Sequence, residues 1–181
     1  ESEEGQGMRN LLQIVRAACD ELGIPRQSAV AGATNSDATQ LLALANRTGK
    51  DLQGREGSAG GWPQLREEHT FTTVNGTSNY AFPTGLQYFI NTTAWDRDQK
   101  WPLNGPVSPQ VWQVLKSGTV GSVGPRTRFR LMDNRIYLDP TPSSANDLVF
   151  EYYKSYWCTD STGATEKELF SADGDLPILP D

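Results

Sequence analysis

The sequence is poor in the residues that build metal centres and disulfide frameworks. Its 181 residues include one histidine and two cysteines. One histidine cannot form a multi-histidine zinc site, and two cysteines alone cannot complete the usual set of four ligands. We therefore expect no metal site and no cofactor. We also expect Cys19 and Cys158 to be free thiols, with Cys19 as a small core residue.

Long apolar runs and an excess of positive charge are also missing. No stretch approaches the roughly 20 apolar residues of a membrane-spanning helix, so we expect no membrane association. The formal net charge is −6, whereas proteins that grip nucleic acid electrostatically need a basic face. The acidity is uneven, because residues 1–7 carry −3, residues 8–60 carry +1, residues 61–140 carry +2 and residues 141–181 carry −6.

Aliphatic residues are scarce too. Leu, Ile, Val and Phe make up about a fifth of the chain, near the boundary below which disorder becomes common. Five Trp, six Tyr and six Phe compensate, because each aromatic side chain buries a large area. The length suits one ordinary domain or a domain with a small insert. We expect a loop-rich fold held together by aromatic residues.

The first predicted helix covers residues 10–22, where apolar residues repeat at helical spacing. Asn10 can cap its start, and Gly23 gives a stop signal. Residues 1–7 lie before Met8, which is a natural initiator. We treat these seven residues as an extension or tag-like tail that takes no part in the fold.

A second amphipathic helix is predicted to start near Thr34, where Asp37 follows at capping-box spacing. Its apolar stripe comprises Leu41, Leu42, Leu44, Ala45, Thr48 and Leu52. The two helices make up a predicted helical region over residues 8–61. Each helix has a single apolar stripe, so each must pack against the other or against a partner.

From Trp62 onward the period changes from 3.6 to 2, which predicts an antiparallel β-rich domain over residues 62–158. Asn75-Gly76 is the strongest short hairpin signal and would place Phe71 opposite Tyr80. One short helix is predicted near residues 108–117.

A second hairpin is predicted together with its register. Three outward arginines alternate with apolar residues on its first strand: Arg126, Arg128 and Arg130. The pairs predicted to face each other are Leu131 with Ile136, Phe129 with Leu138, and Arg128 with Asp139. This register satisfies both the apolar face and a charge pair. Leu148, Phe150 and Tyr152 predict a third strand beside it. Overall, the elements predict an α+β fold, in which N-terminal amphipathic helices carry an antiparallel β-rich insertion domain.

No residue pattern predicts catalysis. His69, the sole imidazole, lies in a predicted strand with no Ser or Cys at a nucleophile elbow, and we expect it to pack beside Phe82. Asp96 and Asp98 could offer two metal carboxylates, but a solvated turn is the favoured interpretation. We therefore expect that the protein is not an enzyme.

An enzyme nevertheless stays open as an alternative. Trp95, Trp101 and Trp112 lie close together in the sequence and could form an aromatic platform for a sugar. Two carboxylate pairs could serve a glycosidase: Glu67 with Glu68, and Asp147 with Glu151. The alternative is thus a carbohydrate-active β module or a peptidoglycan-degrading enzyme. We favour core positions for Trp95 and Trp112. For Trp101, a core position and a functional surface position are about equally favoured.

An ordered series of short segments resembles a known family. In chain order they are Phe71-Thr-Thr-Val-Asn-Gly76, Tyr80-Ala-Phe-Pro83, Phe89-Ile-Asn-Thr-Thr-Ala-Trp-Asp-Arg97, Trp101-Pro-Leu-Asn-Gly-Pro106, Ser108-Pro-Gln-Val-Trp112, Arg128-Phe-Arg130, Leu138-Asp-Pro-Thr-Pro142 and Phe150-Glu-Tyr-Tyr153. The series resembles the head-to-tail adaptor proteins of tailed bacteriophages, of the short-tailed phage tail accessory or head-completion type. The resemblance covers nearly all of residues 8–181.

The resemblance implies a structural virion protein at the head-tail interface, made in the host bacterial cytoplasm. Copies, commonly twelve, would form a ring under the portal protein, extend the DNA channel and carry a tail or nozzle protein. DNA would pass through without sequence-specific binding. A tail-tube terminator ring is a second alternative. The family usually continues past the acidic C-terminal segment, residues 159–181, into further helix, so we transfer no portal-docking residues.

The candidate site in such a protein is a surface between subunits. Rings use heterologous interfaces, in which one surface meets a different surface of the neighbour. We expect the outward arginines to meet an acidic surface, with the C-terminal segment as one candidate and a solvated strand face as the alternative. The residues predicted at the subunit interface are Arg126, Arg128, Arg130, Trp101 and Arg97.

Overall fold

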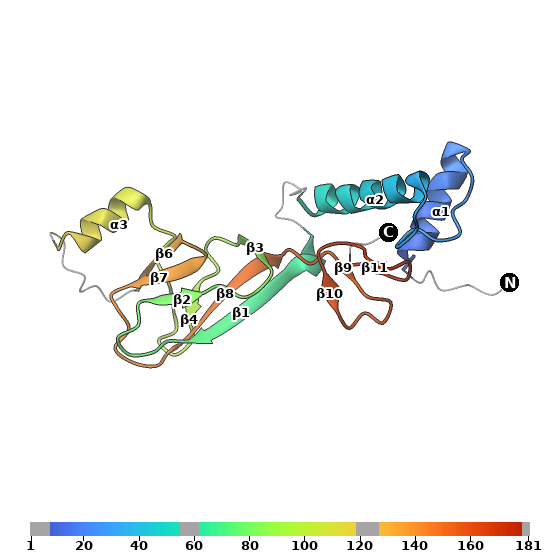
Figure 1. Ribbon diagram of the computed structural model, residues 1–181. Coiled ribbons are helices and arrows are strands. Elements are labelled where there is room, and N and C mark those ends of the chain that lie inside the picture. Colours follow the sequence, from blue (N-terminus) through green and yellow to red (C-terminus); the bar gives the residue numbers. More distant parts are fainter. Residues whose placement is uncertain (1–7, 55–61, 119–126, 179–181) are drawn as a thin grey trace. The chain divides into compact units, whose positions relative to one another are not determined.

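The computed structural model describes residues 8–54, 62–118 and 127–178 (Figure 1). The chain forms two compact units. Unit 1 comprises Glu1–Leu65 and Lys154–Asp181, and unit 2 comprises Arg66–Tyr153. Unit 2 is therefore an insertion between the two halves of unit 1. Helices and antiparallel strands together confirm the predicted α+β class.

Helix α1 spans Leu11–Leu22, as its periodicity predicted. Asn10 Oδ1 accepts a hydrogen bond from the Gln13 amide, and Gln13 Oε1 accepts one from the Asn10 amide, both at 2.9 Å. This capping box satisfies two backbone donors at the helix start. Gly23 ends the helix at φ 69°, a left-handed conformation that glycine adopts without steric cost.

Helix α2 spans Ser36–Gly54 and so begins near Thr34, as predicted. The cap is Asn35, whose Oδ1 accepts a hydrogen bond from the Ala38 amide at 3.0 Å. The predicted Thr34–Asp37 capping box is therefore wrong. Asparagine is at least as good an N-cap as threonine, so the capping signal shifts by one residue without changing the helix.

A tryptophan and a glycine join α2 to the C-terminal half of unit 1. Trp157 is 2% exposed and stacks edge-on against Phe170, with ring centroids 4.7 Å apart. A Cβ atom added at Gly49 would lie 2.2 Å from the Trp157 ring. The helix can approach this indole only because residue 49 has no side chain. Both cysteines of unit 1 are buried and free, as predicted, and burial raises the pKa of Cys158 to about 12.

The acidic C-terminal segment folds as part of unit 1. Its strands are β9 (Cys158–Thr159), β10 (Glu166–Lys167) and β11 (Leu176–Pro177), which form a small sheet in the order β10-β9-β11. The amides of Leu11 and Leu12 donate to the carbonyls of Asp175 and Asp173. The segment thereby satisfies donors in the first turn of α1 that have no partner within the helix.

Asp175 is the buried acid of this segment, with a side chain only 1% exposed. Its carboxylate accepts hydrogen bonds from Lys167 Nζ at 2.8 Å and from the amides of Ser171 and Ala172 at 2.7 and 2.9 Å. Burial by itself raises the pKa of Asp175, but these donors outweigh it and lower the pKa below the usual value.

The described residues of unit 2 form two sheets and one helix. The larger sheet has the order β1-β8-β4-β5, with β3 also paired to β8, and the smaller sheet has the order β2-β7-β6. The strands are β1 (Arg66–Thr72), β2 (Asn79–Ala81), β3 (Leu86–Phe89), β4 (Trp95–Asp96), β5 (Trp101–Pro102), β6 (Arg128–Met132), β7 (Arg135–Asp139) and β8 (Asp147–Lys154). A short 3₁₀ helix, Pro63–Leu65, precedes β1, and helix α3 spans Pro109–Lys116 with Ser108 as its cap.

The predicted hairpin of β6 and β7 is confirmed residue by residue. Leu131 faces Ile136, Phe129 faces Leu138 and Arg128 faces Asp139. The turn residues Asp133 and Asn134 have φ 52° and 53°. Two successive residues at positive φ define a type I′ turn, whose twist matches that of the flanking strands.

The hairpin predicted at Asn75-Gly76 is wrong in its pairing. A turn does form there, since the Thr77 amide donates to the Val74 carbonyl at 3.0 Å. However, β1 pairs with β8 over seven residues, and β2 pairs with β7. The predicted place of β8 beside the β6–β7 hairpin is therefore also wrong. A local turn signal specifies the reversal of the chain, whereas the long ladder with β8 decides the partner of β1.

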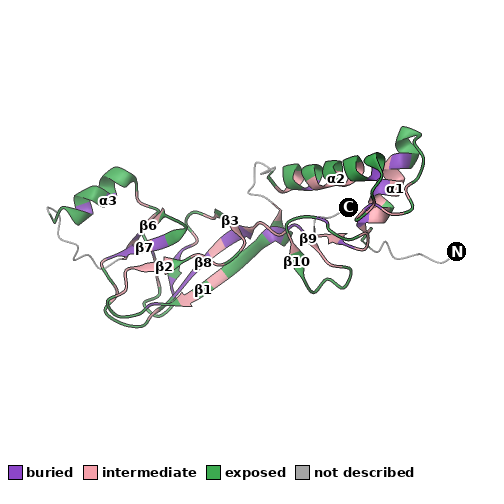
Figure 2. Cartoon of the chain, viewed as in Figure 1, coloured by how far each residue is buried: buried purple, intermediate pink, exposed green. Residues whose placement is uncertain are grey.

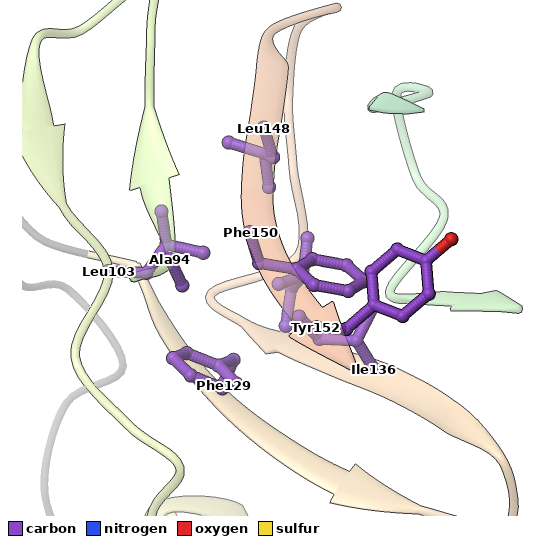
Figure 3. Packing of buried hydrophobic residues seen from close by; sticks show 8 residues of the cluster. Ala94, Leu103, Phe129, Ile136, Leu148, Phe150 and Tyr152 are labelled. Atoms are coloured by element: carbon purple, nitrogen blue, oxygen red, sulfur yellow. The ribbon is translucent and has the colours of Figure 1, made fainter. Parts of the chain in front are cut away.

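The core of unit 2 lies between the inner faces of its two sheets (Figure 3). Strand β8 contributes every second side chain from one sheet, and β6 and β7 contribute theirs from the other. The fully packed members are Ala94, Leu103, Phe129, Ile136, Leu138, Leu148, Phe150 and Tyr152. Burial is accordingly concentrated on β7 and β8 (Figure 2). Because side chains alternate along a strand, this core determines which residues face outward.

Gly49→Ala should destabilise unit 1, because the new methyl group would overlap the Trp157 ring. Overpacking of this kind costs about 1–3 kcal/mol, which urea unfolding followed by tryptophan fluorescence would measure. The matched control is Gly54→Ala in the same helix, where an added Cβ meets no atom within 4 Å. An equal effect of the two changes would contradict the close approach of Trp157.

Asp175→Asn should weaken unit 1 and flatten its acid sensitivity. A group with a lowered folded-state pKa stabilises the fold above its unfolded value, about 3.9, and loses that contribution as the pH falls through the folded value. We expect a loss of about 1–3 kcal/mol at pH 7 and a shallower decline below pH 4. Unfolding curves at several pH values would show both, with the exposed Asp51→Asn as control.

Candidate interaction surfaces

The outer face of the smaller sheet carries a cluster of arginines, which we call the arginine face. It comprises Arg128 and Arg130 on β6 and Arg135 on β7. They alternate with Phe129 and Ile136, which are 0% and 1% exposed in the core. Arg135 belongs to this face because the register places it opposite Met132, although the sequence analysis did not include it. The predicted interface residue Arg126 lies outside the described residues.

Asp139 forms a different charge pair from the one predicted. It stands opposite Arg128 in the register, but its Oδ1 accepts from Lys116 Nζ of α3 at 2.9 Å. The Lys116 ammonium also lies 4.8 Å from the centre of the Trp112 ring. A buried carboxylate needs a close cation, and α3 supplies one. Lys116, rather than Arg128, therefore neutralises the carboxylate of Asp139 through Oδ1.

The outer face of the larger sheet is centred on Trp95, and we call it the Trp95 face. Trp95 is 43% exposed, so the prediction of a core position is wrong. The strand alternates as expected, but its neighbours Ala94 and Asp96 are the ones that point inward, at 3% and 2% exposure. Trp95 lies in one cross-strand row with Val149 of β8 and Thr70 of β1.

Charged side chains surround Trp95 on the same face. Arg97 donates to Glu68 Oε1 at 2.8 Å, and both side chains are about half exposed. Glu151 lies 3.7 Å from Arg66, and Asp147 accepts from the Thr72 hydroxyl at 2.7 Å. Three of the four carboxylates that could be imagined in glycosidase pairs, Glu68, Asp147 and Glu151, are therefore engaged in contacts across the strands. The face combines one exposed indole with both signs of charge.

Trp101, a predicted interface residue, faces the interior of unit 2. It is half-buried beside a cavity of about 190 Å³, which Asp96, Thr73 and Asn146 also line. Its indole Nε1 is buried and has no hydrogen-bond partner among the described residues. The cavity is smaller than the roughly 300–1,000 Å³ of ordinary ligand sites. Arg97 and Trp101 thus point to opposite sides of the larger sheet, and neither lies on the arginine face.

The remaining candidates for chemistry are packed or hydrogen-bonded. Trp112 is 6% exposed, which confirms its core position. His69 packs on Phe150 at 5.3 Å between ring centroids, and Phe82 contacts the same ring at 6.1 Å. Burial lowers the pKa of His69, although Glu67 acts in the opposite direction. Asp96 is buried and accepts from the Gln99 amide and from Asn146, so a solvated turn is wrong for this residue.

Unit 1 contributes an apolar groove of about 460 Å³ between α1, α2 and the C-terminal half. Val15, Leu41 and Leu44 line it, with Trp157 and Phe170 at its base. The stripe of α2 is only partly covered, since Leu44 remains 57% exposed. The described part of the chain contains no group of three or more His, Cys, Asp or Glu residues that could hold a metal ion. Among the described helices, none is both long and apolar enough to cross a membrane.

These features define a class: an α+β protein that carries its charged and exposed aromatic residues on the outer faces of two packed sheets. Comparison with protein families narrows this class. The sequence matches the SU10 adaptor protein family over residues 9–181, and the chain belongs to this family of phage adaptor proteins. A comparison with curated proteins finds no match.

Lys116→Met should destabilise unit 2, because it leaves the carboxylate of Asp139 buried without its cation. We expect a loss of about 1–3 kcal/mol, which the double variant Lys116→Met with Asp139→Asn should partly restore. Urea unfolding of the four proteins in this cycle gives the coupling energy. The control is Arg97→Met, which breaks an exposed pair worth less than about 1 kcal/mol. A coupling near zero would contradict a structural role for the Lys116–Asp139 pair.

Proposed function

We propose that the protein is a ring-forming head-to-tail adaptor of a phage particle. About twelve copies, by resemblance to similar proteins, would dock under the portal protein, extend the DNA channel and provide the platform to which a tail or nozzle protein attaches. The observation that carries the proposal is the family match over nearly the whole chain. Members of an adaptor family are structural phage proteins, so the work of the protein is done by its surfaces.

The two outer faces of unit 2 support this function. Tryptophan and arginine side chains are the types enriched at the energetic centres of protein interfaces. Trp95 and Arg135 are exposed on these faces, and Arg128 and Arg130 are partly buried. We propose that the arginine face lies at the boundary between subunits, with the predicted residues Arg128 and Arg130 as its charged contacts. Arg97 belongs to the same boundary through the Trp95 face.

The charge distribution suits a conduit for DNA. Each fixed contact with a phosphate adds salt-dependent affinity, which would hold DNA rather than let it slide. The chain as a whole carries −6, with the acidity concentrated after residue 140. We propose that DNA passes through the ring without sequence-specific binding, and that the arginines are used between protein subunits.

Electron microscopy of particles that contain the tagged protein tests the function directly. The expected result is a ring between the portal and the tail, and co-purification with the portal oligomer. A ring at the far end of a tail tube would favour a terminator instead. Turnover of peptidoglycan that one Asp or Glu substitution abolishes would overturn the structural role in favour of an enzyme.

Arg128→Glu combined with Arg130→Glu should impair assembly of the ring, because both changes invert the charge of the arginine face. The dependence of assembly on salt concentration should change for the same reason. Native mass spectrometry of adaptor–portal complexes over a salt series measures the effect. The control, Arg47→Glu with Lys50→Glu on α2, makes the same change in net charge at exposed positions of unit 1. Unchanged assembly and salt dependence in the first variant would show that the arginines form only a solvated surface.

A further inference from the structure

We propose that the Trp95 face of one copy binds the arginine face of the next copy, so that neighbouring subunits meet through the two outer faces of unit 2. The inference rests on the proposed ring, and it names the surfaces that join its subunits. It also replaces the acidic C-terminal segment, the candidate partner considered from the sequence, with a specific face built from strands β1, β4 and β8.

Exposure of Trp95 is the first observation. Its row neighbour Val149 is 6% exposed although it lies on the outer side of the sheet. The indole, at 43% exposure, therefore lies beside an already covered apolar residue of the same row, and it offers a large flat surface for a partner. A tryptophan placed centrally and surrounded by polar residues is the usual arrangement of an interface hot spot.

The side chains around Trp95 determine which residue types a partner must present to this face. The carboxylates of Glu68, Asp147 and Glu151 lie on the same face as the indole. An arginine guanidinium stacks on an aromatic ring and also binds a carboxylate through two parallel hydrogen bonds. Glu68 is now paired with Arg97, and Glu151 lies 3.7 Å from Arg66. Ion pairs between side chains exposed to this degree are weak and can exchange for intersubunit ones.

The opposite side of unit 2 carries the complementary groups. Arg128, Arg130 and Arg135 lie on the arginine face. The carboxylate on the same face, Asp139, is 4% exposed and bonded to Lys116. The arginine face therefore keeps a positive charge that its own strands do not neutralise, and the Trp95 face of a second copy supplies carboxylates and an indole for it.

The symmetry of such a contact agrees with a ring. The two faces lie on opposite sides of the shared core, since each is formed by the side chains that alternate with core residues. A contact between two different faces is heterologous, and it repeats from copy to copy until a rotation closes it. Every subunit then uses both faces, and no copy is left with its Trp95 exposed.

Cysteine cross-linking in assembled particles tests the contact. Thr70→Cys introduces a thiol on the Trp95 face and Met132→Cys introduces one beside the arginine face, while the native cysteines are buried. A chain with both changes, treated with a short bismaleimide, should give a ladder of dimers, trimers and longer oligomers. Each single variant should give at most dimers. Absence of the ladder in particles that contain the chain would overturn the inference and leave the adaptor role intact.

Trp95→Ala gives the second readout. We expect the affinity between copies in adaptor–portal assemblies to fall about thirtyfold, the effect of removing a hot-spot residue. Val74→Ala is the control, because Val74 is also an exposed apolar side chain, at 57%, but lies in the turn after β1. If Trp95→Ala impairs tail attachment while the affinity between copies is unchanged and the double-cysteine chain gives no ladder, the face binds another protein and the inference is wrong. If the unchanged chain is missing from particles, the proposed function itself fails.

Discussion

The packing of the Phe150 ring holds unit 2 together and orients its surfaces. This ring contacts His69, Phe71, Phe82, Phe89 and Tyr152, with centroid distances from 5.0 to 6.3 Å. In a chain with few aliphatic residues, this cluster of aromatic rings supplies the buried apolar area that leucines provide in other cores. Because Phe150 points inward from β8, its strand neighbours Val149 and Glu151 point outward. The Trp95 face and the arginine face lie on opposite surfaces because the two sheets pack against each other around Phe150.

The packing of unit 1 likewise depends on a few specific contacts. Its helices do not bury their apolar stripes against each other alone, and the C-terminal half covers a further part of them. Trp157 fits against Gly49, and Asp175 collects donors from Lys167 and the adjacent backbone. The acidic segment is thus a structural part of unit 1 rather than a charged tail. Several of its carboxylates are consumed by internal hydrogen bonds, which is why it is a poorer partner for a neighbour's arginines than its net charge indicates.

In the proposed ring, each adaptor would hold its neighbours firmly while DNA moves past it. The proposed contact would meet the first requirement through tryptophan stacking and arginine–carboxylate contacts, both of which are short-ranged and directional. Using the basic residues between subunits would meet the second. Membership of a phage adaptor family directs attention to these contact surfaces.

Local patterns in the sequence determined the elements that depend on neighbouring residues. The capping box of α1, the start of α3 at Ser108 and the register of the β6–β7 hairpin all follow from side chains a few positions apart. Tertiary structure alone decided that β1 pairs with β8, that Lys116 binds Asp139, and that Trp95 faces outward. These outcomes depend on partners distant in the chain, and alternation within a strand cannot tell which of its two sides the core will cover.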